Sequence, residues 1–285
     1  MNTFTSLLAK PVAEEIKAET RDRAIRFAQA RGRKPKLVVV LVGDNPASMI
    51  YVSSKGKTAD TLGISSETLT FPATATAAEI QAAVSKLNAD PHVDGILIQR
   101  PLPPAFREEE VLYWVHPSKD VDAFHPENTG RLSLGLPCFI PCTPAGIMEL
   151  LRFYKIETRG KIACVVGRSS IVGKPMATLL LRADATVLHA HSRTPDLRSL
   201  CRQADIVVAA IGKAKMIDAS YVRQGAVVVD VGINRDAAGK VVGDVDFEAV
   251  SQVASAVTPV PGGVGPMTIA MLMKNTVFAA EQRAH

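Results

Sequence analysis

The sequence has few aromatic residues and no long apolar run. Aromatic side chains make up 5% of its 285 residues, so the stacking surfaces that hold nucleic-acid bases are scarce. No apolar run approaches the roughly eighteen residues that a membrane span requires. The N-terminus lacks the basic segment and apolar stretch of a signal peptide. We therefore expect a cytoplasmic protein that binds neither nucleic acid nor membranes.

Cysteines are also few, and none of them forms a C-x-x-C pair. Cys164 falls in a predicted buried strand, and the other cysteines are interpreted as small packing residues. His189 and His191 would face one side of a strand, but no spaced cysteine or carboxylate completes a zinc ligand set. We expect a reduced, metal-free protein. The cysteines are Cys138, Cys142, Cys164 and Cys201.

What the chain does have is the composition of a globular protein. Hydrophobic residues make up 47% and charged residues 21%, which suits a full buried core. The net charge of +5 is spread along the chain. Mild basicity favours ligands that carry phosphate or carboxylate groups.

The segment Lys161–Pro175 predicts a strand, a glycine turn and a helix. Ile162–Val166 is an unbroken apolar run, typical of a strand buried on both faces of a parallel sheet. Gly167 ends the run, and Met176–Leu181 is predicted to be helical. Such a turn leaves backbone N–H groups free at the helix start, where a phosphate can bind.

Two familiar phosphate motifs fail on this segment. A P-loop has four residues between its glycines, followed by Lys-Ser/Thr; here five residues separate Gly167 from Gly173, and Pro175 follows the lysine. The G-x-G-x-x-G fingerprint fails because Arg168 and Ser169 replace glycines. A variant dinucleotide turn remains possible, and so does an ordinary strand-turn-helix.

The next predicted strand strengthens the cofactor interpretation. Ala185–Ala190 ends about twenty residues on, where NAD-binding folds place an acid for the ribose hydroxyl. This chain has His191-Ser192-Arg193-Thr194 there instead, and a hydroxyl and a cation suit a 2′-phosphate. Further apolar runs follow, separated by helical or turn-rich segments, and this alternation predicts a doubly wound α/β sheet. The missing acid and the cation after Ala190 predict that the sheet binds NADP rather than NAD. Those runs are Ile206–Ala210, Ala226–Val231 and Ala256–Val260.

The N-terminal half predicts a second, smaller α/β unit. Asn45 and Pro46 are expected to start a helix, and Thr76 with Glu79 forms a capping box that opens another. A helix from Thr143 to Tyr154 leads into the cofactor unit, and a helix from Met267 closes the chain. The other expected elements are a helix over Pro11–Ala28 and strands over Leu37–Val42, Ser66–Phe71 and Gly95–Gln99.

The candidate chemical groups lie in this smaller unit. Tyr51 and Lys55 are four residues apart and share a helix face. Gln99 leaves the carboxyl end of a strand, the edge where open α/β sheets bind ligands. Lys119-Asp-Val-Asp122 adds carboxylates. A solvated helix lysine and turn-capping aspartates would explain the same residues, so these spacings alone name no reaction.

Six blocks of the sequence, spread over nearly the whole chain, form a larger pattern. The blocks start at Gly43-Asp-Asn-Pro46, with Tyr51 and Lys55 following, and continue with Gln99-x-Pro-Leu-Pro103, Lys119-Asp-Val-Asp122, Phe139-Ile-Pro-Cys-Thr-Pro144, Gly167-Arg-Ser-x-Ile-Val-Gly-x-Pro175 and Pro259-Val-Pro-Gly-Gly-Val-Gly-Pro-Met-Thr268. Together, and in this order, they resemble the bifunctional methylenetetrahydrofolate dehydrogenase/methenyltetrahydrofolate cyclohydrolase family (FolD family).

The resemblance implies two α/β domains with a cleft between them. Residues 1–140 and 267–285 would form a folate/catalytic domain, and residues 141–266 a Rossmann-type NADP domain. The implied reactions are NADP-dependent oxidation of 5,10-methylenetetrahydrofolate and hydrolysis of the methenyl product to 10-formyltetrahydrofolate. The implied partners are tetrahydrofolate derivatives and a second copy of the chain in a homodimer.

The resemblance also assigns roles to single residues. Lys55 would be the key catalytic residue, Gln99 would orient it, Tyr51 would stack on the folate and Asp122 would hold the pterin. The folate site would also be lined by Pro261, Gly262 and Gly263. NADP would be contacted by Gly167, Arg168, Ser169, Ser192 and Ile233; Arg193 is added from the charge argument.

The chain departs from the family pattern at two positions near the folate site. Arg100 follows the glutamine where an apolar residue is usual, and Ala123 replaces a glycine after Asp122. A monofunctional dehydrogenase of the same fold is one alternative, but it would be signalled by loss of Lys55. A non-catalytic, nucleotide-sensing protein is another, and Tyr51, Lys55, Gln99 and Asp122 argue against it.

Overall fold

The computed structural model describes residues 4–283, which divide into two compact units. The small-sheet unit comprises Glu15–Cys142 and the chain from Ile269 onward. The large-sheet unit comprises the segment ending at Glu14 together with Thr143–Thr268. Two helices contain a boundary between the units: α1 (Ala9–Arg31) and α10 (Val264–Gln282).

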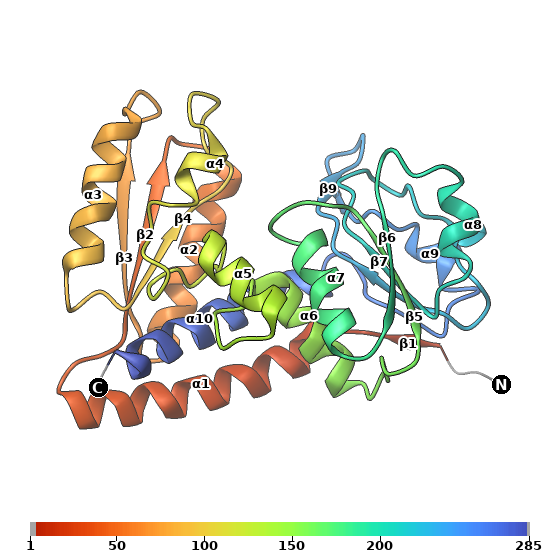
Figure 1. The fold of residues 1–285 in the computed structure, drawn as a ribbon, viewed down its shortest axis with the longest axis horizontal. Helices are drawn as coiled ribbons and strands as arrows, with labels where there is room; N and C mark the ends of the chain where they lie inside the picture. Colours follow the sequence, from red (N-terminus) through yellow and green to blue (C-terminus); the bar gives the residue numbers. More distant parts are fainter. Residues whose placement is uncertain (1–3, 284–285) are drawn as a thin grey trace. The chain divides into compact units, whose positions relative to one another are not determined.

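The small-sheet unit is built on a parallel sheet with β2 at its centre. β2 (Lys36–Val42) pairs with β3 (Ser65–Phe71) on one side and with β4 (Gly95–Ile98) on the other (Figure 1). The expected apolar run of β2 is buried along almost its whole length, as the central strand of a parallel sheet requires. The helices of this unit are α2 (Pro46–Thr61), α3 (Ala77–Ala89), α4 (Glu108–Val111) and α5 (Pro126–Leu134).

Helix α3 packs on one face of this sheet. The predicted capping box is confirmed, because Thr76 and Glu79 exchange side-chain and backbone hydrogen bonds at the helix start. Ile80 and Val84, one turn apart, are both buried. They join a core cluster with alternate residues of β2 and β4, which point to the same face; its members include Val38, Val40, Val42, Ile96, Ile98, Phe106 and Trp114.

The large-sheet unit contains the strand order β1-β11-β8-β7-β5-β6, and all neighbouring strands run parallel. Helices α6 (Cys142–Phe153), α7 (Gly173–Arg182), α8 (Leu197–Cys201) and α9 (Phe247–Val250) and the 3-10 helix η1 (Ala219–Tyr221) connect or flank them. The chain leaves β5 toward β6 on one side and returns to β7 on the other. The strands are β1 (Thr5–Ser6), β5 (Ile162–Val166), β6 (Thr186–Ala190), β7 (Ile206–Ala209), β8 (Val227–Asp230) and β11 (Ala256–Val257).

Several short elements were not predicted from the sequence. The antiparallel hairpin of β9 (Asn234–Arg235) and β10 (Val241–Val242) is one of them. Strand β1 is another: Thr5 and Ser6 pair with Ala256 and Val257. This pairing places Thr5 and Ser6 in the large-sheet unit, whereas the expected division assigned residues 1–140 to the folate domain.

None of the helices within residues 4–283 is both long enough and apolar enough to cross a lipid bilayer.

Candidate active site

Lys55 and Gln99 form a buried pair in the small-sheet unit. Lys55 Nζ donates to Gln99 Oε1 at 2.9 Å, and the two residues are only 8% and 9% exposed. Gln99 Nε2 donates to the Arg100 carbonyl at 2.6 Å, so the amide oxygen is turned toward the lysine. Gln99 also continues the β4 ladder, because its N–H donates to Val40 O. A neutral acceptor thus holds the lysine at the carboxyl end of a strand.

The local sequence of α2 explains how Tyr51 and Lys55 reach this position. Asn45 Oδ1 accepts from the Ser48 N–H at 3.1 Å and caps the helix, with Pro46 as its first residue. Tyr51 lies one turn before Lys55 and is 40% exposed, so its ring is available for stacking on a ligand.

The Asp122 carboxylate interacts electrostatically with the Lys55 charge. The carboxylate is partly buried, and burial raises its pKa, while the Lys55 charge, the Cys142 thiol and the Arg100 charge lower it. Cys142, interpreted from the sequence as a packing residue, is buried, and its Sγ donates a hydrogen bond to Val121 O. No local pattern links Cys142 to Asp122, twenty residues earlier; only its position in a matching block could have marked it.

The other charged residues of the Lys119–Asp122 block point elsewhere. Asp120 accepts from the His125 N–H at 2.8 Å and from Asn128 Nδ2 at 3.1 Å, and so shapes the turn after Asp122. Burial raises the pKa of Asp120 to about 6. Ala123 within this turn has φ of 63°, a left-handed conformation that favours glycine.

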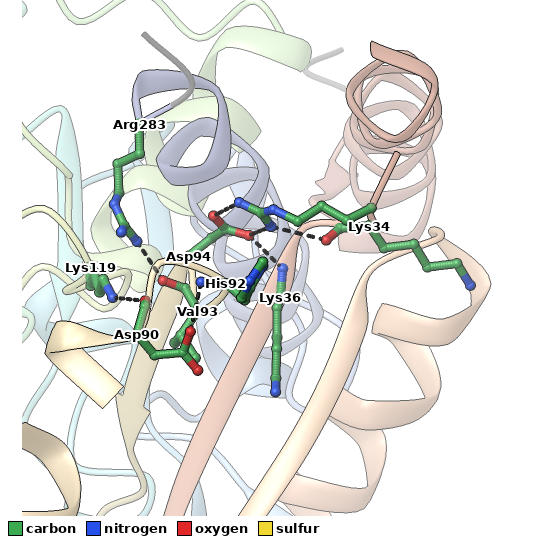
Figure 2. A network of polar contacts seen from close by, with 9 residues as sticks. Lys34, Lys36, Asp90, His92, Val93, Asp94, Lys119 and Arg283 are labelled. Atoms are coloured by element: carbon green, nitrogen blue, oxygen red, sulfur yellow. Dashed lines mark hydrogen bonds and ion pairs between the residues drawn. The ribbon is translucent and has the colours of Figure 1, made fainter. Parts of the chain in front are cut away.

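Lys119 is a structural residue that anchors the end of α3. Its Nζ donates to the carbonyls of Leu87 and Asp90 at 2.8 and 2.6 Å, and Arg283 reaches Val93 O nearby (Figure 2). Burial, followed by the Arg283 charge, lowers the pKa of Lys119 to about 8. Because these backbone carbonyls occupy the amine, the lowered pKa of Lys119 reflects its place in the fold.

Arg100, one of the two departures from the family pattern, is held near enough to Asp122 to influence its carboxylate. Its Nη1 pairs with Glu108 Oε2 at 2.7 Å, and its guanidinium lies 5.5 Å from the centre of the Phe124 ring. These contacts hold a positive charge that lowers the pKa of Asp122.

A second group of predicted residues lies at the turn between β5 and α7. Gly167 has φ of 130°, and a Cβ there would collide with Ala210 O. A Cβ on Gly173 would collide with Gly167 O. Ser169 Oγ accepts from the N–H groups of Val172 and Gly173 at 3.2 and 3.3 Å, while the Arg168 side chain is exposed. This turn offers the close backbone approach that a dinucleotide requires.

Two histidines, His189 within β6 and His191 just after it, make polar contacts at the end of this strand. His189 Nε2 lies 2.8 Å from Gly167 O, and since a carbonyl can only accept, this nitrogen carries the hydrogen. His191 Nδ1 accepts from the Arg193 N–H at 3.1 Å. Ser192 and Arg193 are exposed, so this strand end presents a hydroxyl and a cation.

The other predicted contacts lie in the same unit. Ile233 follows β8 and is 57% exposed. Gly262, with φ of 106°, and Gly263 follow Pro261 in a loop tied to α1, where the Ala9 N–H donates to Gly262 O at 2.9 Å. A Cβ on Gly263 would lie 2.5 Å from Pro259 O. The turn residues thus lie at the carboxyl ends of β5, β6 and β8, whereas Tyr51, Lys55, Gln99 and Asp122 belong to the small-sheet unit.

Comparisons with known protein families agree with this arrangement. Residues 7–122 match the catalytic domain of the tetrahydrofolate dehydrogenase/cyclohydrolase family, and residues 141–284 match its NAD(P)-binding domain. The bifunctional protein FolD of Geobacillus thermodenitrificans is 53% identical over 273 residues, which are 96% of each chain. The FolD protein of Desulfovibrio desulfuricans is 54% identical over 279 residues, covering 96% of this chain and 97% of that one.

Solved structures give the same result. The bifunctional enzyme FolD from Campylobacter jejuni superposes with a TM-score of 0.96 at 48% identity, covering 99% of this chain and 100% of that one. The Trypanosoma brucei FolD structure, complexed with NADP cofactor and inhibitor, has a TM-score of 0.94 at 35% identity and covers 99% of each chain.

A doubly wound parallel sheet with a glycine turn after β5 is typical of dinucleotide-binding proteins. The chain belongs to the tetrahydrofolate dehydrogenase/cyclohydrolase family. The resemblance identified from the sequence blocks, the α/β fold class, the bifunctional enzyme class and the NADP cofactor are thereby confirmed.

Proposed function

We propose that Lys55, Gln99, Tyr51 and Asp122 carry out the folate chemistry of this chain, and that the turn at Gly167 binds NADP. The chain would oxidise 5,10-methylenetetrahydrofolate and then hydrolyse the methenyl product to 10-formyltetrahydrofolate. The observation that carries the proposal is the buried Lys55–Gln99 hydrogen bond of 2.9 Å beside Asp122.

The residues around the glycine turn fit a dinucleotide. Gly167 and Gly173 leave no room for side chains, and the exposed groups after β5 and β6 offer cations and hydroxyls. Arg168, Ser192 and Arg193 would bind the 2′-phosphate, with Ser169 and Ile233 as further contacts. NADP, when bound, supplies the carbon that accepts the hydride. The chain itself needs only to hold and align the two rings for this step.

The hydrolysis step needs proton handling by the protein. Water adds to the cationic methenyl carbon and loses one proton, which leaves a neutral hydroxyl adduct. The bond from that carbon to one folate nitrogen then breaks; the hydroxyl gives up its proton to become the formyl carbonyl, and the nitrogen takes up a proton. Lys55 Nζ orients the water and moves the proton. Gln99 Oε1 holds the amine without adding a negative charge.

The remaining residues bind the substrate. The Asp122 carboxylate accepts two parallel N–H bonds from the pterin ring, and Tyr51 stacks on the folate with its exposed ring. Pro261, Gly262 and Gly263 are proposed as further folate contacts, on the resemblance to the family. A homodimer and a cytoplasmic location complete the proposal; both rest on the resemblance to the family.

Replacing Lys55 should separate the two activities. Lys55→Met should keep measurable NADP-dependent dehydrogenation, because hydride transfer takes no proton from the lysine. The same variant should lose nearly all cyclohydrolase turnover, since positioned proton transfer is typically worth ~10²–10⁴-fold. Both steps are assayed on one preparation by following NADPH formation and loss of the methenyl compound.

Lys57→Met is the matched control, because Lys57 is an exposed lysine on the same helix. It should retain both activities. Cyclohydrolase turnover near the wild-type rate in Lys55→Met would reduce Lys55 to a structural lysine and refute its proposed role.

A further inference from the structure

Two buried carboxylates of the large-sheet unit lie near the carboxyl ends of β7 and β8. Asp230 is the last residue of β8 and is 2% exposed, and Asp244 follows β10 and is fully buried. A buried carboxylate is costly unless its charge is met by hydrogen bonds. The donors that surround these two side chains therefore reveal what the carboxylates hold in place.

Asp244 ties two loops together. Its Oδ2 accepts from the N–H groups of Ile211 and Gly212 at 2.5 and 3.0 Å, in the turn that follows β7. Its Oδ1 accepts from the Lys213 N–H at 2.8 Å and from Asn234 Nδ2 at 2.9 Å. Asn234 belongs to the segment after β8, so one carboxylate fixes the turns after both strands.

Asp230 in turn fixes Asp244. Its Oδ1 accepts from the N–H groups of Gly232 and Asp244, both at 2.9 Å, and its Oδ2 accepts from the Val245 N–H at 3.0 Å. The packing is close: a Cβ on Gly232 would collide with the Asp244 carboxylate, and one on Gly243 would collide with that of Asp230. The backbone at Gly232 and Gly243 is therefore packed directly against the two carboxylates, with no space for a side chain between them.

The loops held by Asp244 border the proposed cofactor site. The strand order reverses between β5 and β7, and open α/β sheets bind their ligands at such a switch point, outside the carboxyl ends of the strands. The turn after β7 begins at Ala210, whose carbonyl faces Gly167. The segment after β8 carries Ile233, between Gly232 and Asn234, which the two carboxylates hold.

We propose that Asp244 is a positioning residue for NADP binding, which acts by holding the turns after β7 and β8 in the shape that accepts the dinucleotide. This inference rests on the proposed cofactor role of the strand ends in this unit. Asp244 is buried behind the loops and acts through their backbone.

The bifunctional enzyme provides an internal control for this proposal. Hydrolysis of the methenyl compound uses no nicotinamide cofactor, so a defect confined to the dinucleotide loops should spare it. Asp244→Asn replaces one carboxylate oxygen by an N–H₂ group that cannot accept. Losing charge-assisted bonds should raise the KM for NADP about tenfold or more, with a smaller change in kcat and with near wild-type cyclohydrolase kinetics.

Asn234→Ala and Asp236→Asn complete the series. Asn234→Ala removes a single bond to Asp244 and should raise the KM for NADP and the dissociation constant of NADPH severalfold, even if Asp244→Asn fails to fold. Asp236 is a half-buried carboxylate in the turn of the same hairpin, and it accepts from the N–H groups of Ala238 and Lys240 at 3.0 and 2.9 Å. Asp236→Asn should leave the KM for NADP unchanged.

The outcomes separate this proposal from the proposed function. Unchanged NADP affinity in Asn234→Ala and in any folded Asp244→Asn would overturn the positioning role. Equal loss of both activities in Asp244→Asn, with a wild-type KM in Asn234→Ala, would also overturn it. If the wild-type chain itself bound no NADP, the failure would belong to the proposed cofactor site instead.

Discussion

Around Asp122, two cations act on one carboxylate. Burial raises the pKa of Asp122, whereas Lys55 and Arg100 lower it. Because the net direction is upward, the carboxylate takes up a proton at a higher pH than an ordinary aspartate. A protonated Asp122 can no longer accept two N–H bonds, so pterin binding should weaken as the pH falls through this pKa.

Removing the Arg100 charge should therefore move the acidic limb of the pH profile. Arg100→Leu takes away one interaction that lowers the pKa of Asp122, so the pKa should rise further. We expect the acidic limb of kcat/KM for the folate to shift to higher pH. The profile is measured for both activities between about pH 4 and 9.

The control for this shift is Glu108→Gln, which removes the ion-pair partner of Arg100 but keeps the guanidinium. Its acidic limb should stay at or below the wild-type position. An unaltered limb in Arg100→Leu would show that Arg100 does not influence the group that titrates.

Ala123 explains why the second departure from the family pattern is tolerated. Its φ of 63° is a left-handed conformation that costs a non-glycine residue roughly 1–2 kcal/mol. The methyl group is 1% exposed, and burying it recovers about 0.8 kcal/mol. Burial therefore offsets part of the cost, and the turn after Asp122 keeps its left-handed shape with alanine in place of glycine.

The strand-turn-helix of β5 and α7 is the element on which cofactor choice depends. Arg168 is exposed on the turn, and Ser192 and Arg193 are exposed after the neighbouring strand β6. The segment His191-Ser192-Arg193-Thr194 contains no carboxylate, so nothing in it repels a 2′-phosphate.

Arg168→Ala should raise the KM for NADP far more than that for NAD. A charge-assisted hydrogen bond contributes about 1.5–3 kcal/mol, or roughly ten- to a hundredfold in affinity. Steady-state kinetics with both cofactors measure the effect. Arg159→Ala, at an exposed arginine paired with Asp184, serves as the control; equal effects on both cofactors in Arg168→Ala would refute the assignment.

Elements with a strong local pattern were predictable, and those that depend on distant partners were not. The buried runs of β2 and β5 and the capping box of α3 carry their signal within a few residues. Strand β1 is two residues long and exists because Thr5 and Ser6 pair with Ala256 and Val257. The same limit applies at the site, where Cys142 approaches Asp122 only through tertiary packing.

For the whole molecule, the proposed homodimer makes a direct prediction. Large apolar side chains are exposed, among them Leu134 at 75% and Leu181 at 63%, and a subunit interface could cover such groups. Sedimentation at micromolar concentration should show a species of twice 30.4 kDa that dissociates on dilution. A single 30.4 kDa species at every concentration would refute the dimer.

The interleaved path of the chain limits how the molecule can be divided. The large-sheet unit takes its edge strand β1 from the N-terminus, and the small-sheet unit takes most of α10 from the C-terminus. A fragment of residues 143–268 would therefore leave β11 with an unpaired edge. A fragment of residues 15–142 would lose Asn275, which bonds Val121 O and Ile140 O at 2.8 and 3.2 Å. Neither central segment contains a whole unit. Recombination between relatives must therefore exchange residues 143–268 together with the N-terminal segment, or residues 15–142 together with the C-terminal segment.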